Sequence, residues 1–190
     1  MEILVGGLIL FLGVHSVRIF AEGWRTSIIA RIGIGPWKGL YALASIAGFV
    51  LLVWGYGMTR AAPALWYPPM WTRHITALLM IVSFVLLAAA YVPGNGIKAR
   101  IGHPMIAGVK IWALAHLLSN GRTGDVLLFG AFLLWAILDF RASRKRDRAT
   151  GTVYPSLGTS RTVIAVAAGL AAYLVFVFGL HLWLIGVRPY

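Results

Sequence analysis

Three ionisable side chains lie inside one apolar segment of the chain, HPMIAGVKIWALAH. They are His103, Lys110 and His116, and the remaining residues of this segment are apolar or small. A fourth ionisable side chain, His15, lies in an apolar segment near the start of the sequence. Ionisable groups are costly within a hydrocarbon layer and are usually functional there. Imidazoles held on different helices in an apolar interior are typical axial ligands of haem b, so we consider a buried haem site.

Helical spacing indicates which of these side chains share a face. His103 and Lys110 are seven residues apart and point the same way, whereas His116 points nearly the opposite way. Trp112, Ala113 and Asn120 share the face of His116. His103 and His116 therefore cannot bind one ion from opposite sides, and each needs a partner on another helix.

The first apolar segment carries a second polar stripe. His15, Arg18 and Glu22 follow the i, i+3, i+7 spacing of one helix face. The small residue Gly13 lies close to His15, as alanines do beside His116, which leaves room for a porphyrin ring. Arg18 is suited to pair with a haem propionate.

These side chains are carried by a chain with the composition of a membrane protein. Of 190 residues, 60% are hydrophobic and 12% are charged, and the mean hydropathy is +0.85. We expect an all-α, polytopic fold that forms a single transmembrane domain over residues 1–190. The first segment lacks the features of a cleaved signal peptide, so we expect it to be the first span. Six spans are predicted, over residues 3–21, 37–58, 74–92, 103–118, 123–140 and 162–187.

The basic residues predict the orientation of these spans. Eleven lysines and arginines fall in the connections after the first, third and fifth spans, and four fall on the other side. The positive-inside rule then places both termini outside the cytoplasm of a bacterial inner membrane. The net charge of +12, including the basic run at 141–148, is assigned to lipid headgroups rather than to nucleic acid. The sequence has no cysteine, which excludes thiolate ligands and disulfides.

Three sequence patterns are distinctive, and they comprise His15-Ser16-x-Arg18, Gly35-x-x-Lys38-x-x-Tyr41-x-x-x-Ser45, and His103-Pro104-x5-Lys110-x-Trp112-Ala113-x-x-His116-Leu117-Leu118-x-Asn120-Gly121. Together they resemble the NnrU family, over roughly residues 1–148, and the related zeta-carotene isomerase of plants and cyanobacteria. That isomerase is a membrane haem b enzyme that isomerises a cis double bond with reduced iron. NnrU proteins are associated with nitrite and nitric oxide metabolism in denitrifying bacteria.

The resemblance implies a haem b with His15 and His116 as axial, metal-binding and catalytic residues. The other residues expected at the cofactor are Arg18, His103, Lys110, Trp112, Ala113 and Asn120. The ligand would be a lipophilic polyene or a small gas such as nitric oxide. Two activities are compatible with the resemblance, haem-dependent isomerisation and chemistry on nitrogen oxides.

Two alternatives follow from the residues themselves. Judged by depth along the helices, the two axial ligands of the haem could instead be His74 and His116, or His15 and His103. If they bind no iron, His74 and His181 are suited to the membrane interface. A cofactor-free transporter or assembly factor could instead use Lys110 and the histidines as a polar pathway.

Overall fold

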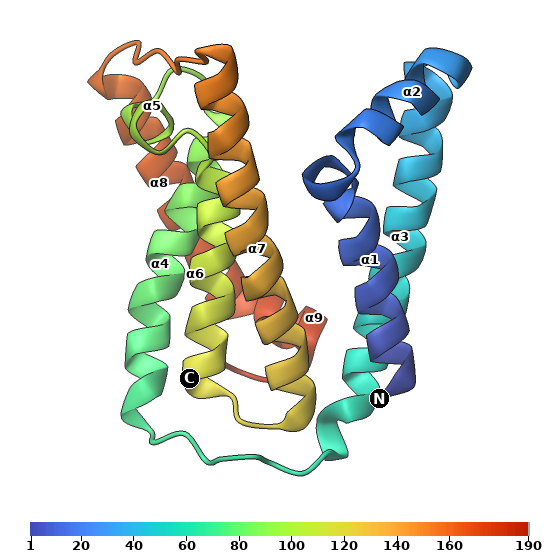
Figure 1. Ribbon diagram of the computed structural model, residues 1–190. Helices are drawn as coiled ribbons and strands as arrows, with labels where there is room; N and C mark the ends of the chain where they lie inside the picture. The colour runs from blue at the N-terminus through green and yellow to red at the C-terminus, as the bar shows by residue number, and fades with distance from the viewer. Residues whose placement is uncertain (190) are drawn as a thin grey trace.

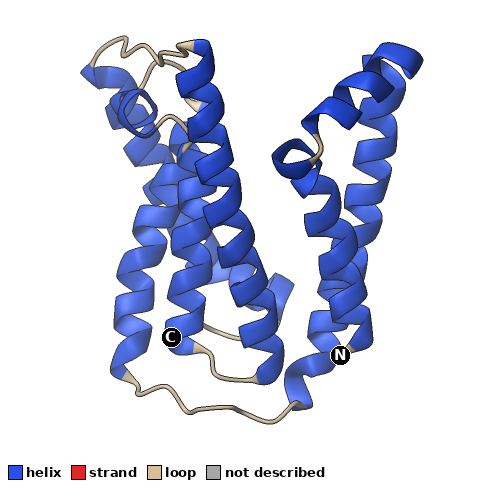
Figure 2. Cartoon of the chain, viewed as in Figure 1, coloured by secondary structure: helices blue, strands red, loops and turns tan. Residues whose placement is uncertain are grey.

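The computed structural model describes residues 1–189, which are helical apart from short connections and contain no strand (Figure 2). The all-α prediction is confirmed. The elements are α1 (Glu2–Phe20), α2 (Glu22–Ile32), α3 (Ile34–Met58), η1 (Thr59–Ala61), α4 (Trp71–Tyr91), α5 (Gly96–Ile101), α6 (Pro104–Ser119), α7 (Thr123–Thr150), α8 (Thr159–Val175), the π-helical η2 (Phe176–Leu180) and α9 (His181–Ile185).

Five helical segments within the described residues are long and apolar enough to cross a membrane. They are Glu2–Phe20, Ile34–Ala61, Trp71–Tyr91, Thr123–Thr150 and Thr159–Ile185. The predicted fourth span corresponds to α6, which is apolar but only 16 residues long. A helix of that length is slightly shorter than a typical span. The number of six crossings and the outside location of both termini therefore stay predictions.

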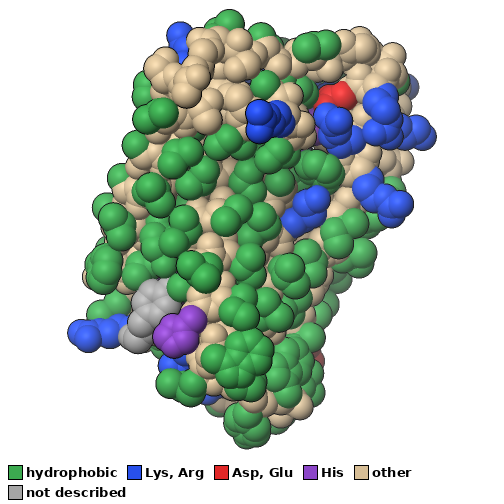
Figure 3. All heavy atoms as spheres, turned by 90° about the vertical axis from the view of Figure 1, so that its left-hand side faces the viewer, with side chains coloured by type: hydrophobic (Ala, Val, Ile, Leu, Met, Phe, Trp, Pro, Cys, Tyr) green, Lys and Arg blue, Asp and Glu red, His purple; other side chains and the backbone are tan. Residues whose placement is uncertain are grey.

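The surface of the long helices is suited to lipid. No more than 22% of the apolar window in any of the five segments is buried within the protein. On the face shown in Figure 3, hydrophobic side chains cover the middle and most lysines and arginines gather toward one end. This distribution is typical of helices whose outer faces contact hydrocarbon.

The helices form two groups that meet at α7. In Figure 1, α1 and α3 run side by side, and α4, α6, α7 and α8 form the second group. α7 packs against α6 on one side and α1 on the other, so it lies between the two helices that carry His15 and His116.

Glycines allow α1 and α3 to approach closely. A Cβ atom added to Gly55 would lie 2.4 Å from the backbone nitrogen of Leu4, and one added to Gly48 would lie 2.7 Å from that of Phe11. Gly7 on α1 meets the backbone of α3 in the same way. Small residues at such crossings are a common means of packing helices in membranes.

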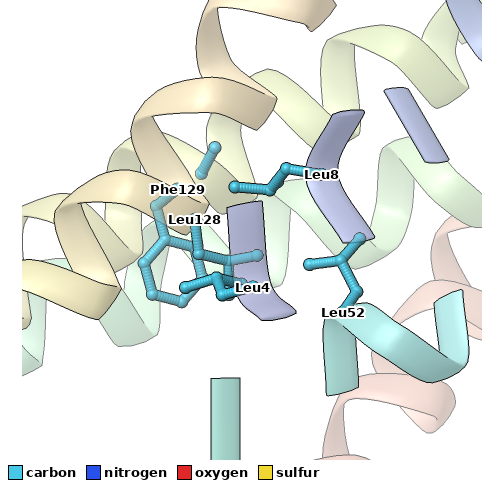
Figure 4. Packing of buried hydrophobic residues seen from close by; sticks show 6 residues of the cluster. Leu4, Leu8, Leu52, Leu128 and Phe129 are labelled. Atoms are coloured by element: carbon cyan, nitrogen blue, oxygen red, sulfur yellow. The ribbon is translucent and has the colours of Figure 1, made fainter. Parts of the chain in front are cut away.

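The core lies where the two groups meet. Its buried members are Leu4, Leu8, Leu52, Ala113, Leu128 and Phe129, from α1, α3, α6 and α7, and five of these are labelled in Figure 4. Leucine and phenylalanine side chains fill the junction, which fixes α7 between α1 and α6.

Two of the connections between the predicted spans contain additional helix. The connection after α1 contains α2, and α7 continues ten residues past the predicted end at residue 140. Within this extension Arg144 lies 3.7 Å from Asp147, and Ser143 donates a hydrogen bond to Asp139, both at helical spacing. Gly151, in the left-handed conformation with φ 63°, ends the helix.

Candidate functional site: two histidine pockets

His116 lies near the end of α6 with one ring nitrogen held by its own helix. Its Nδ1 is 2.9 Å from the carbonyl oxygen of Trp112. A carbonyl oxygen only accepts, so Nδ1 carries the proton and Nε2 keeps its lone pair. The ring stacks on Phe129 of α7, with the two centroids 4.7 Å apart. This tautomer is the one that histidines bound to a metal usually adopt.

His116 lines a cavity of about 440 Å³ formed where α3, α6 and α9 end. Asp125, at the start of α7, lies in its wall and is 8% exposed. The Tyr56 hydroxyl donates to Asp125 Oδ1 at 2.7 Å, and the backbone amide of Arg122 donates to Oδ2 at 3.0 Å. Both carboxylate oxygens are therefore engaged within the protein.

The same cavity is strongly basic. Arg60, Arg73, Arg122 and Arg188 all line it, against the single carboxylate described above. Arg60 donates to the carbonyl oxygen of Ile185, and Arg122 donates to the carbonyl oxygen of Arg60. The guanidinium groups of Arg73 and Arg188 have no hydrogen-bond acceptor or acidic partner among residues 1–189. The cavity is suited to an anionic group.

His15 lies in a second, smaller pocket of about 240 Å³ at the opposite end of α3. Its Nδ1 is 2.7 Å from the carbonyl oxygen of Phe11, so this ring has the same tautomer as His116. The imidazole centroid is 5.3 Å from the ring of Tyr41 and 6.1 Å from that of Trp135. Arg18 lines this pocket as well.

The structure places His15 and His116 in different pockets. They contact α7 at Trp135 and Phe129, six residues apart, which is a rise of about 9 Å along the helix. The aromatic ring of Phe132 lies between them and contacts α1 and α6. Axial imidazoles must both lie within about 2 Å of the metal, as ligand bonds of this kind require. His15 and His116 therefore face different pockets in this structure, and a haem held by both rings stays a prediction.

His103 and Lys110 lie apart from both pockets. The Nε2 atom of His103, at the start of α6, is 2.8 Å from Asp147 Oδ2 of α7. Tyr154 donates to the other oxygen of Asp147 at 3.1 Å. The pKa of the Tyr154 phenol is raised, mainly by burial and secondly by the Asp147 carboxylate. The Lys110 ammonium lies 3.7 Å from the centre of the Phe140 ring, which is a cation–π contact.

The remaining predicted site residues divide between the cavity and the core. Trp112 packs against His116, with centroids 5.5 Å apart, and Ala113 is fully buried in the core. Asn120 lines the cavity and donates to the carbonyl oxygen of His116 at 2.9 Å. His74 is exposed at the start of α4 and lines neither pocket described here.

Several residues at the larger cavity are not predicted from the sequence. His181, which the sequence predicts at the membrane interface, also lines the same cavity as His116. Its Nδ1 is 2.7 Å from the carbonyl oxygen of Val187. Arg73 and Arg188 were counted only as topology signals. The Arg122-to-Asp125 spacing is the one local signal that could have placed Asp125, because the carboxylate accepts from the Arg122 amide at the start of α7.

The fold and the pockets define a helical membrane protein with histidines on separate helices. The family model described as NnrU protein matches residues 3–189, and the chain belongs to this family. The match extends past the patterns at residues 1–148 to the last helices. Searches of the curated proteins and of the solved structures found no match.

Proposed function

We propose that this chain is a membrane haem protein in which His116 bonds the iron through Nε2. The observation that carries the proposal is the hydrogen bond from Nδ1 to the carbonyl oxygen of Trp112, which leaves Nε2 free at the edge of the larger cavity. Stacking on Phe129 fixes the plane of the ring. His15 is not part of this site, because it faces the other pocket.

The walls of the cavity suit the rest of a haem. Trp66, Ile185 and Val187 supply apolar surface for the macrocycle. Arg73 and Arg188, which have no acceptor among the described residues, are available to pair with the propionates. Residues 1–189 contain no group of three or more His, Asp or Glu side chains placed to hold a bare metal ion. Haem needs only one or two protein ligands, since the porphyrin supplies four nitrogens.

A haem with one protein ligand supplies an iron position that is open to a small gas or to the double bond of a lipophilic polyene. Isomerisation of a polyene and nitrogen-oxide chemistry are therefore the two activities we propose. The chain's own contribution is to orient the ring of His116 and to concentrate anionic groups at the arginines. Asp125 and Tyr56, already joined by a hydrogen bond, are placed to hold a proton beside the cavity.

One arrangement favours a second candidate, a cofactor-free anion pathway. Basic pockets lie at the two ends of α3, the larger with four arginines and the smaller with Arg18, Arg25 and Lys38. Aromatic side chains of α1, α6 and α7 fill the space between them. Such a pathway would require these aromatic side chains to move.

The two candidates are separated by the optical spectrum of the full chain, expressed in haem-sufficient cells and purified in detergent. Haem binding predicts a Soret band that shifts when carbon monoxide is added to the reduced protein. The double variant Arg73→Gln/Arg188→Gln should lose haem more readily than Arg31→Gln, an exposed arginine outside both pockets. A folded, colourless protein that transports nitrite into liposomes would contradict haem binding and support the anion pathway.

A further inference from the structure

The smaller pocket has an unbalanced positive charge. Arg18, Arg25 and Lys38 line it. The Glu22 carboxylate lies 2.9 Å from Arg25 and 3.9 Å from Arg18. Asp139 of α7 also lies within electrostatic range of Arg18 and Tyr41, and it pairs with Arg146 at 3.8 Å. The Lys38 side chain makes no hydrogen bond or ion pair within the described part of the chain. The ammonium of Lys38, unlike Arg18 and Arg25, has no acidic partner and is therefore available to an external anion.

A neutral hydrogen-bond donor completes the polar side of this pocket. Tyr41 lies one turn after Lys38 on α3 and lines the same space. Its hydroxyl has no hydrogen-bond partner among residues 1–189, whereas Ser45, on the next turn, is satisfied by the carbonyl oxygen of Tyr41. The two donors on α3 thus face the same space as Arg18 of α1. Convergent cationic and hydroxyl donors of this kind bind phosphate oxygens.

The other walls of the pocket are apolar and lie near the end of the bundle. Val14, Val17, Ile34 and Trp37 line it. Trp37 meets Trp24 of α2 edge to face, with centroids 5.8 Å apart, and α2 has no buried residue. Trp24 is exposed and Trp37 is half-buried. Tryptophans beside basic residues are typical of the headgroup level of a membrane. The pocket therefore offers both polar and apolar contacts at the depth where lipid phosphates lie.

We propose that this pocket binds the phosphate group of an anionic membrane phospholipid. Lys38 and Arg18 pair with the phosphate oxygens, the Tyr41 hydroxyl donates to one of them, and the apolar walls contact the glycerol and the first part of an acyl chain. Inorganic phosphate shares the charged group but not the apolar part. The proposal is independent of haem binding, because it uses the other pocket.

Native mass spectrometry of the full chain, released from detergent with added phosphatidylglycerol, tests this site. The protein should retain one tightly bound lipid. Lys38→Gln should weaken that binding about tenfold, the effect expected for loss of one charge-assisted hydrogen bond. Tyr41→Phe should weaken it by a smaller factor. The matched control is Arg31→Gln, which removes the same charge from an exposed position of α2 outside the pocket, and it should bind lipid as the wild type does.

Circular dichroism establishes that each variant is folded before lipid binding is compared. Equal retention of phosphatidylglycerol by Lys38→Gln, Tyr41→Phe and Arg31→Gln would overturn the proposal. A second arm adds inorganic phosphate in place of lipid. If inorganic phosphate displaces the bound lipid at comparable concentration, the free anion is the ligand and the assignment to lipid is wrong; retention of the lipid supports it.

Discussion

His15 and His116 pack against the same helix, α7, but at Trp135 and Phe129, on opposite sides of Phe132. Each ring has its Nδ1 bound to the carbonyl oxygen four residues earlier in its own helix. The two histidines are therefore alike in tautomer and different in location. This relationship gives the protein two pockets at the two ends of α3, and it assigns the haem proposal to His116 alone.

The close contact of α1 with α3 predicts a large difference between two neighbouring glycines. Gly55→Ala would place its Cβ atom 2.4 Å from the Leu4 backbone nitrogen, which a rigid backbone cannot relieve. We expect it to reduce the free energy of unfolding by about 1–3 kcal/mol, as overpacking does. Gly57→Ala, two residues on, meets nothing within 4 Å and should be neutral. Unfolding in mixed detergent micelles measures both, and equal stability of the two variants would contradict this packing.

The hydrogen bond between Tyr56 and Asp125 predicts a graded loss of stability. Tyr56→Phe removes one neutral donor to a charged acceptor and should cost about 1–2 kcal/mol. Asp125→Ala should cost more, because it also removes the acceptor of the Arg122 amide. Thermal unfolding in detergent provides the comparison, with Tyr67→Phe, 88% exposed, as the control. A Tyr56→Phe variant as stable as Tyr67→Phe would show that the bond does not hold α3 to α7.

The pair formed by His103 and Asp147 predicts that His103 stabilises the fold at the start of α6 and does not bind the cofactor. The two side chains are only 21% and 11% exposed, and truncation removes the His103 hydrogen bond from Asp147 Oδ2, which keeps only Arg144 at 3.7 Å. His103→Ala should lower the free energy of unfolding by about 1–3 kcal/mol without changing haem content. His74→Ala, which is exposed, is the matched control and should do neither. Loss of haem from His103→Ala in a folded protein would place that residue at the cofactor after all.

The positions of the helices can be predicted from hydropathy, whereas the residues that share a pocket cannot. Apolar runs of span length are a strong signal, and each predicted span corresponds to helix in the structure. The extension of α7 to Thr150 was missed because Arg141–Arg148 was interpreted by charge alone, although its i, i+3 and i, i+4 pairs favour helix.

Which histidines share a pocket depends on packing that has no local signal. Helical periodicity correctly separates His103 from His116, since both lie on one helix. The position of His181 depends on the π-helical turn at Phe176–Leu180, which rotates the residues that follow it. The separation of His15 from His116 depends on α7 lying between α1 and α6, a long-range arrangement that spacing along the chain does not encode.

The ratio of haem to protein in two single variants tests the central claim most directly. The pyridine haemochrome assay on purified His116→Ala and His15→Ala, each verified as folded by circular dichroism, gives this ratio. We predict that His116→Ala loses its haem and that His15→Ala retains the wild-type ratio. Full haem content in His116→Ala, or equal loss from both variants, would contradict the assignment of the iron to the larger cavity.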